Sequence, residues 1–246
     1  MKSQKMHRLL KELVIGSLSN MKTLIKKLIT VLNTIFYLVF EKNILAKKTQ
    51  FYLAQLNIGK NNSAVFTTSE INKSSITISG EMNLIEVNNA LVSHTTINIS
   101  GTNNKISIDP DVKLRGSTIR IRGNNCIIKI GKGTSFGGIR MVNAGVNNAI
   151  TIGQNCLFAD YIELWASDTH TISNDQNEQI NQEKPITIGD RVWVGSHAII
   201  LKGVTINNDS VIGMGTLVTK DVPPFTISAG SPNRTIKEGI SWKLEY

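Results

Sequence analysis

Residues that can carry acid–base chemistry gather at one break in an otherwise regular sequence. Asp168 and His170 lie two residues apart where an alternating apolar segment ends, and Trp193 lies beyond the polar stretch that follows. An imidazole has an ordinary pKa of about 6.5, so His170 can take a proton from a hydroxyl near neutral pH and pass it on. The alternative is a loop histidine that caps a strand. His170 is therefore the candidate general base, and Asp168 either orients its ring or caps the turn.

The break itself predicts a loop. Residues 173–184 read SNDQNEQINQEK, and burying these side chains without partners would cost several kcal/mol. A six-residue apolar frame that includes Phe158 and Leu164 would place positions 170, 176 and 182 in the core, where the sequence has His, Gln and Gln. The sequence therefore predicts a loop that projects near residues 171–185, with the regular pattern resuming at Ile186.

Upstream of the break the sequence repeats every 21 or 22 residues. An aliphatic or aromatic residue usually stands five and seven positions after each repeated glycine, and an asparagine follows each glycine. Glycine and asparagine tolerate the positive φ that tight corners need. The glycines are Gly59, Gly80, Gly101, Gly123 and Gly145, and the asparagines are Asn62, Asn83, Asn104, Asn125 and Asn148.

Downstream the period shortens to six, with a small or β-branched residue four positions after each aliphatic one. Three such short strands close one triangular coil, and coils that cannot bury their apolar side alone must stack. The sequence predicts an all-β parallel solenoid with a helical N-terminal segment at 1–56, long repeats at 57–152, six-residue repeats at 153–224 and a tail at 225–246. The aliphatic positions are Ile188, Val194, Ile200, Ile206, Ile212 and Val218.

The charge lies at one end of the chain. Of the net charge of +9, residues 1–50 hold ten Lys or Arg and two Glu, which leaves 17 basic and 16 acidic residues in the rest. A nearly neutral body lacks the basic face that nucleic-acid binding requires, so we expect no nucleic-acid partner. Cys126 and Cys156 form no CxxC pair, which indicates neither a metal site nor a disulfide framework.

The N-terminal segment contains a basic, apolar helix. Residues 28–40 (LITVLNTIFYLVF) are 13 residues, short of the roughly 18–20 that span a bilayer, and no small-x-small cleavage site follows them. Met21 is an alternative start. One interpretation is a helix that packs on its own trimer or domain. The other is a peripheral membrane contact through residues 1–50, in which the lysines attract anionic headgroups.

Several motifs appear in the order of a known family. They are Asp168-Thr-His170, then Pro185-Ile-Thr-Ile-Gly-Asp-Arg-Val-Trp-Val-Gly195, Ile200-Leu-Lys-Gly-Val204, Val211-Ile-Gly213, Val218-Thr-Lys-Asp-Val-Pro223 and Ala229-Gly-Ser-Pro232. This order resembles the hexapeptide-repeat acyltransferases, in the branch that O-acetylates capsular and other cell-surface polysaccharides, including polysialic acid O-acetyltransferases. The resemblance is specific over about residues 145–236 and only architectural over 57–144. It implies a left-handed parallel β-helix, a homotrimer with active sites between subunits, and acetyl-CoA as co-substrate without a metal.

The same resemblance assigns roles to residues. It makes His170 the base and places Trp193 beside the thioester and the acceptor, although an outward tryptophan also suits a subunit contact. Backbone N–H groups near Gly195 and Ser196 are candidates for the oxyanion, and cations meet the phosphates of CoA. The residues that it implies for the co-substrate are Gly195, Ser196, Lys202, Gly213, Gly215, Thr216, Lys220 and Arg234.

The function that we expect is acetyl transfer to a hydroxyl of a bacterial surface polysaccharide, of capsule, O-antigen or sialic-acid type, or to its precursor. Because acetyl-CoA is a cytosolic donor, we expect the enzyme in the cytoplasm or at the inner face of the cytoplasmic membrane. Two alternatives stay open, an acetyltransferase for a small amino sugar or antibiotic and a non-catalytic solenoid that binds glycans. His7, His94 and His197 are too scattered for the three-His zinc site of a trimeric carbonic anhydrase.

Overall fold

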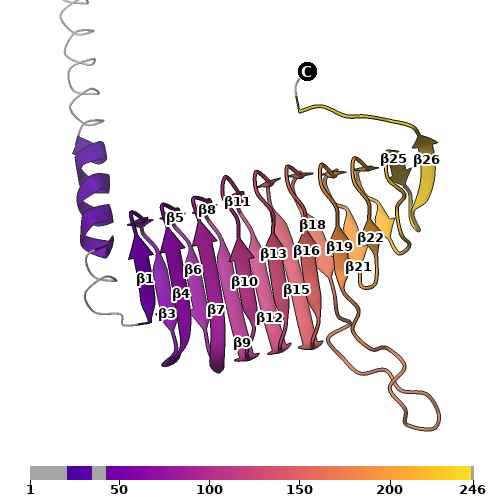
Figure 1. Ribbon diagram of the computed structural model, residues 1–246, viewed down its shortest axis with the longest axis horizontal. Helices are drawn as coiled ribbons and strands as arrows, with labels where there is room; N and C mark the ends of the chain where they lie inside the picture. The colour runs from indigo at the N-terminus through magenta and orange to yellow at the C-terminus, as the bar shows by residue number, and fades with distance from the viewer. Residues whose placement is uncertain (1–20, 35–42, 245–246) are drawn as a thin grey trace, which may run out of the picture.

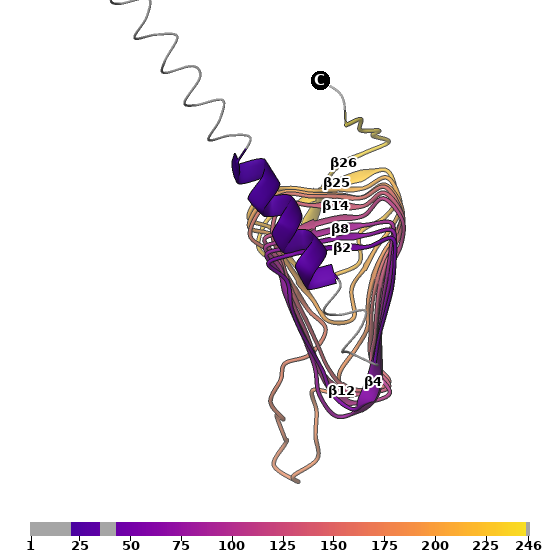
Figure 2. The ribbon, with the colours of Figure 1, turned by 90° about the vertical axis from the view of Figure 1, so that its left-hand side faces the viewer.

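The computed structural model describes residues 21–34 and 43–244, and residues 43–244 form one parallel β-solenoid (Figure 1). Each coil has three faces, and the strands of each face pair in parallel with the same face of the next coil. Viewed from the N-terminal end, the chain winds counter-clockwise as it recedes, so the coils are left-handed (Figure 2). The predicted left-handed parallel β-helix is confirmed.

The first and second faces belong to one 16-stranded sheet, joined by a contact between β7 and β9. The first face contains β1 (Ile44–Lys47), β4 (Asn61–Thr67), β7 (Glu81–Asn88), β10 (Lys105–Ile108), β13 (Ile127–Ile130), β16 (Ala149–Ile152), β19 (Ile186–Ile188) and β22 (Thr205–Ile206). The second face contains β3 (Gln55–Ile58), β6 (Ser75–Ile78), β9 (Thr96–Thr102), β12 (Thr118–Asn124), β15 (Ile139–Val146), β18 (Ile162–Trp165), β21 (Ile199–Leu201) and β24 (Leu217–Val218).

The third face is a separate sheet of short strands. It ends in an antiparallel pair, where the chain turns back across the last coil. Its strands are β2 (Gln50–Tyr52), β5 (Glu70–Asn72), β8 (Leu91–Ser93), β11 (Lys113–Arg115), β14 (Ser135–Phe136), β17 (Leu157–Phe158), β20 (Trp193–Val194), β23 (Val211–Ile212), β25 (Thr226–Ala229) and β26 (Arg234–Glu238).

The repeated aliphatic positions form the core, as the sequence predicts. All six aliphatic positions of the six-residue frame are buried, and so are the small residues four positions after each, such as Ala198 and Ser210. In the long coils, Ile85, Ile106, Ile128 and Ile150 stack in register on the first face and are fully buried. Each side chain packs against the equivalent one in the next coil, so apolar burial adds coil by coil.

The repeated glycines mark the corner between the second and first faces, which we call the glycine corner. At Gly101 φ is +106°, and a Cβ would lie 1.9 Å from the carbonyl oxygen of Gly123, so a side chain cannot fit. Buried asparagines stack beside these glycines, with Asn83 Nδ2 donating to Asn62 Oδ1 and Asn104 Nδ2 to Asn83 Oδ1, both at 2.9 Å. These bonds satisfy polar groups that would otherwise be buried without partners.

Three predicted features need correction. The solenoid begins at Ile44 rather than at residue 57, because Ile44 and Phe51 already fill an inward apolar coil. Residues 225–246 are not only a tail, since β25 adds a strand to the third face. The asparagine ladder continues at Cys126 rather than Asn125, because Cys126 is the buried residue whose N–H donates to Asn104 Oδ1.

The N-terminal helix occupies residues 21–34 of the described chain, and residues 35–40 of the predicted segment lie outside the described residues. Of the described helices, none has the length and apolarity that crossing a membrane requires.

Candidate active site

The predicted loop leaves the solenoid at the glycine corner. The chain departs after β18, runs outward through residues 166–185 and re-enters at β19, so this 166–185 loop replaces the tight corner that other coils make there (Figure 1). Gly101 and Gly123 each pack against the repeated glycine of the next coil. Gly145 packs instead against the side chain of Glu183, which belongs to the loop. The loop therefore carries His170 away from the coil while both of its ends stay fixed to the sheet.

The base of the loop is clamped by one lysine. Lys202 Nζ donates to Asp168 Oδ2 at 2.5 Å and to the carbonyl oxygens of Asn181 and Gln182 at 2.9 and 3.0 Å. The Lys202 ammonium is the main cause that holds the pKa of the Asp168 carboxyl below its ordinary value, with the Asn181 amide adding to it against partial burial. Lys202 is therefore engaged with the base of the loop, and its role toward the phosphates of CoA stays a prediction.

Asn181 joins the two arms of the loop. Its Nδ2 donates to Asp168 Oδ2 at 2.9 Å and to the carbonyl oxygen of His170 at 2.8 Å, and its Oδ1 accepts from the N–H of Ile172 at 2.8 Å. The backbone around His170 is thus held on both sides. Sequence reasoning missed Asn181, since an amide within a polar loop carries no distinguishing signal.

The His170 ring faces outward from this fixed backbone. His170 is exposed, and within the described residues its ring has no hydrogen-bond partner. Asp168 directs its carboxylate at Lys202 and Asn181, so the structure favours the turn-fixing role of Asp168 over orientation of the imidazole. The ring is therefore accessible from outside the described chain.

Trp193 lies on the other side of the coil. It belongs to β20 on the third face, whereas the loop leaves from the opposite, narrow end of the triangular cross-section (Figure 2). Its side chain points outward as predicted and is 40% exposed. One chain therefore does not bring His170 and Trp193 together.

A second tryptophan stands beside Trp193. Trp242, in the segment after β26, has its ring centroid 6.1 Å from that of Trp193, and its Nε1 donates to the carbonyl oxygen of Arg191 at 2.7 Å. Arg191 forms an ion pair with Asp209 at 2.6 Å, and its guanidinium donates to the carbonyl oxygen of Trp242 at 3.4 Å. Sequence reasoning missed Trp242, because its position follows from the return of the tail over the third face.

The predicted co-substrate residues lie mainly at the corner between the third and second faces. The Gly195 N–H donates to the Ile212 carbonyl at 2.8 Å, so it is not free for an oxyanion, while the Ser196 N–H has no backbone partner among the described residues. Thr216 is buried and its hydroxyl donates to the Gly213 carbonyl at 2.7 Å, so its side chain lies in the core. Gly215 stands open, with nothing within 4 Å of a Cβ placed on it.

Lys220 and Arg234 lie together at the C-terminal end of the solenoid, and both are exposed. Asn233, next to Arg234, accepts from the Lys220 N–H at 3.2 Å and donates to the Lys220 carbonyl at the same distance. Asn233 thus joins the backbone of Lys220 to the residue before Arg234, whereas Lys202 bonds to the 166–185 loop.

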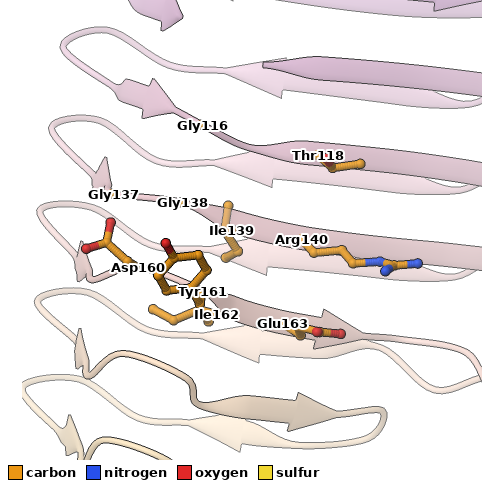
Figure 3. A pocket seen from close by; sticks show the side chains of 10 residues that line it. All are labelled: Gly116, Thr118, Gly137, Gly138, Ile139, Arg140, Asp160, Tyr161, Ile162 and Glu163. Carbon is orange, nitrogen blue, oxygen red and sulfur yellow. The ribbon is translucent and has the colours of Figure 1, made fainter. Parts of the chain in front are cut away.

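A groove of about 390 Å³ opens on the coils just before the Ser196 corner (Figure 3). Its floor is glycine, at Gly137 and Gly138, and Asp160 and Tyr161 gather at the corner while Arg140 and Glu163 extend along the second face. Tyr161 is 72% exposed, and its ring stacks on that of His197 with centroids 5.0 Å apart.

Groups next to the groove are fixed by neighbours. Trp165 Nε1 donates to Glu163 Oε2 at 2.6 Å, and the Arg140 guanidinium lies 4.8 Å from the centre of the Trp165 ring. The groove thus presents an exposed aromatic ring, two carboxylates and one guanidinium, a combination that suits a polar ligand with apolar faces.

The comparisons with known proteins agree with this architecture. Residues 185–220 match the model of the hexapeptide repeat of succinyl-transferase. The polysialic acid O-acetyltransferase of Escherichia coli O1:K1 / APEC is 34% identical over 139 residues, which is 56% of this chain and 44% of that protein. The chain is a relative of the hexapeptide-repeat acyltransferases.

Further relatives extend the likeness. The galactoside O-acetyltransferase of Escherichia coli (strain K12) is 44% identical over 90 residues, 36% of this chain and 44% of that protein. Among solved structures, the polysialic acid O-acetyltransferase OatWY aligns with a TM-score of 0.66 at 28% identity over 80% of this chain and 91% of that one. The polysialic acid-specific acetyltransferase NeuO aligns with 0.63 at 29% over 82% of both. The chain spans about half the length of the curated relatives it matches, and 44% of the two named here.

No group of three or more His, Cys, Asp or Glu side chains is placed to hold a metal among the described residues. Both cysteines are buried in the coils, and desolvation raises the pKa of the Cys156 thiol to about 11. Cys126 and Cys156 therefore act as small packing residues.

Proposed function

We propose that the protein is an O-acetyltransferase that moves acetyl from acetyl-CoA to a hydroxyl of a bacterial surface polysaccharide or its precursor. The observation that carries this proposal is the exposed His170 ring, which has no hydrogen-bond partner in the described chain and stands on a clamped loop. The names of the relatives, which include acetyltransferases of polysialic acid and of galactosides, support the reaction class. We place the enzyme in the cytoplasm or at the inner face of the cytoplasmic membrane, where its donor is made.

The active site is completed by a second protomer of a homotrimer. His170 and Trp193 lie on opposite sides of the coil, so a site that uses both takes His170 from one protomer and Trp193 from its neighbour. A closed ring of three identical contacts produces three equivalent sites.

In the reaction His170 removes the proton of the acceptor hydroxyl as the oxygen attacks the thioester carbonyl. The tetrahedral intermediate places negative charge on the former carbonyl oxygen, which the free N–H of Ser196 stabilises. Collapse breaks the C–S bond, and the imidazolium returns its proton to the departing thiolate. The products are the acetyl ester and free CoA, and no acyl-enzyme forms.

The donor follows the corner between the third and second faces toward the C-terminus. The pantetheine arm passes the open backbone at Gly215, and the phosphates lie near Lys220 and Arg234. Arg234 offers a bidentate fork to phosphate oxygens, which a lysine does not.

The acceptor occupies the groove at Gly137 and Gly138. Tyr161 provides a face for a sugar ring, and Asp160 and Glu163 accept hydrogen bonds from hydroxyls. Arg140 and Glu163 line the groove along the second face (Figure 3), and we infer that it takes one residue of a long chain. This favours a polymeric acceptor over a small amino sugar or antibiotic.

Acetyl incorporation into purified capsular and O-antigen polysaccharides tests the proposal. We expect one of them to be acetylated, and we expect His170→Ala to reduce turnover at least about a hundredfold, the usual contribution of a general base. His94→Ala is the matched control, since His94 is an exposed corner histidine distant from the loop. Equal activity of His170→Ala would overturn the mechanism, and no thermal stabilisation by acetyl-CoA would favour a binding protein instead.

A further inference from the structure

The N-terminal helix turns its apolar side to solvent. Apolar residues recur along residues 21–34 at the spacing of one helical stripe, and no described residue packs over them. A helix that packed on its own core would bury this stripe. The exposed members are Met21 (51%), Leu24 (67%), Ile25 (48%), Leu28 (58%), Val31 (52%) and Leu32 (58%).

The polar side of the helix faces the first coil. Thr34 Oγ1 accepts from the N–H of Phe51 at 3.4 Å, and Lys26 Nζ lies 5.1 Å from the centre of the Tyr52 ring. Thr23 and Thr30 line the hollow between the helix and this coil, and Lys27 and Val31, at one edge of the apolar stripe, border the same hollow. These contacts tether the helix to the first coil through polar residues, and the helix lies at the N-terminal end of the solenoid (Figure 2).

Lysines border the stripe on both edges. At 100° per residue, Lys22 lies beside one edge and Lys27 beside the other, and both are exposed. If two copies of the chain paired through this stripe, their lysines would approach one another and repel. Anionic lipid headgroups would instead neutralise the charge of these lysines. The charge of residues 1–50, ten basic against two acidic, has the same sign.

We propose that residues 21–34 dock on an anionic lipid surface, with the apolar stripe in the headgroup–acyl boundary and Lys22 and Lys27 at the phosphates. A stripe of this kind lies in the interface plane, so it needs no spanning length. The membrane then contacts the N-terminal end of the solenoid, and the 166–185 loop lies several coils away from it (Figure 1).

Flotation of the full chain with vesicles tests the proposal. We expect binding to vesicles of phosphatidylcholine mixed with phosphatidylglycerol and little binding to phosphatidylcholine alone. The double variant Leu24→Ser, Leu28→Ser lowers partitioning at least about tenfold. Lys22→Gln and Lys27→Gln lower it about fivefold each at low salt. Met82→Ser, which removes an equally exposed apolar side chain from β7, is the matched control.

Two results would overturn the docking proposal. The first is no binding of the wild type to anionic vesicles, and the second is equal vesicle binding by the wild type and the Leu24→Ser, Leu28→Ser variant. If that variant also changes its oligomeric mass, the stripe belongs to a contact with a second copy of the chain. An unchanged melting temperature of the variants shows that the solenoid remains folded, because the stripe lies outside its core.

Discussion

Replacement of Lys202 by methionine removes the clamp at the base of the 166–185 loop. The substitution deletes three hydrogen bonds donated by one ammonium and leaves Asp168 with the Asn181 amide alone. A bond to a charged group contributes about 1.5–3 kcal/mol when shielded from water. The Lys202 side chain is 18% exposed and that of Asp168 is 39% exposed, so screening lowers the loss to about 1–2 kcal/mol.

Hydrogen exchange measures this loss directly. A change of about 1–2 kcal/mol raises the opening equilibrium of the loop roughly fivefold to thirtyfold, so amide exchange over residues 167–182 accelerates by that factor. Exchange in β13 and β16 stays unchanged, since residues 168–185 of the loop add nothing to the core. Lys132→Met, which removes a surface pair with Asp111 at 3.8 Å, is the control and leaves exchange as it is. Unaltered loop exchange in Lys202→Met would refute the clamp.

The clamp also predicts a pH dependence. Because Lys202 lowers the pKa of Asp168 in the folded protein, the clamp stabilises the loop at neutral pH. The stabilisation disappears as the pH falls below the ordinary value of 3.8 and through the lower folded value. In acid, loop exchange in the wild type should therefore approach that of Lys202→Met, and a difference that persists below both pKa values would contradict this cause.

Three other predictions follow from the packing. Trp242→Ala removes the ring beside Trp193 and the bond to the Arg191 carbonyl. We expect the KM for acetyl-CoA or for the acceptor to rise while the protein stays folded. Unchanged kinetics would show that Trp242 serves only in packing. Phe158→Ala removes a buried ring whose centroid lies 4.7 Å from that of Phe136. Denaturant titration should show a loss of about 3–5 kcal/mol in the free energy of unfolding, and a loss under about 1 kcal/mol would contradict tight packing of the core. Cys156, whose thiol has a pKa of about 11, should resist iodoacetamide at neutral pH until the protein unfolds, and rapid labelling of the native state would show that the coil opens there.

The solenoid could be read from the sequence because each coil repeats the same local pattern. A six-residue alternation specifies which side chains enter the core, and His170, Gln176 and Gln182 showed where that alternation must stop. The start at Ile44 was missed, since no glycine stands 21 residues before Gly59 to mark the first coil, although Phe51 fills its core.

The site was harder to predict because its contacts join distant parts of the sequence. Lys202 meets Asp168 across 34 residues, and Trp242 meets Arg191 across 51. Periodicity predicts which face a residue occupies but not which exposed groups pair with each other. For the same reason, the sequence did not show that the loop that carries His170 and the strand that carries Trp193 stand on opposite sides of the triangle.

Mixing two inactive chains tests the central claim, a site shared between protomers. His170→Ala and Trp193→Ala are co-expressed with different tags, and mixed assemblies are purified by both tags in turn. In a trimer whose sites combine His170 of one protomer with Trp193 of the next, each mixed assembly contains one intact site, so activity returns to about a third of the wild type. Activity no higher than that of either variant alone would contradict the shared site.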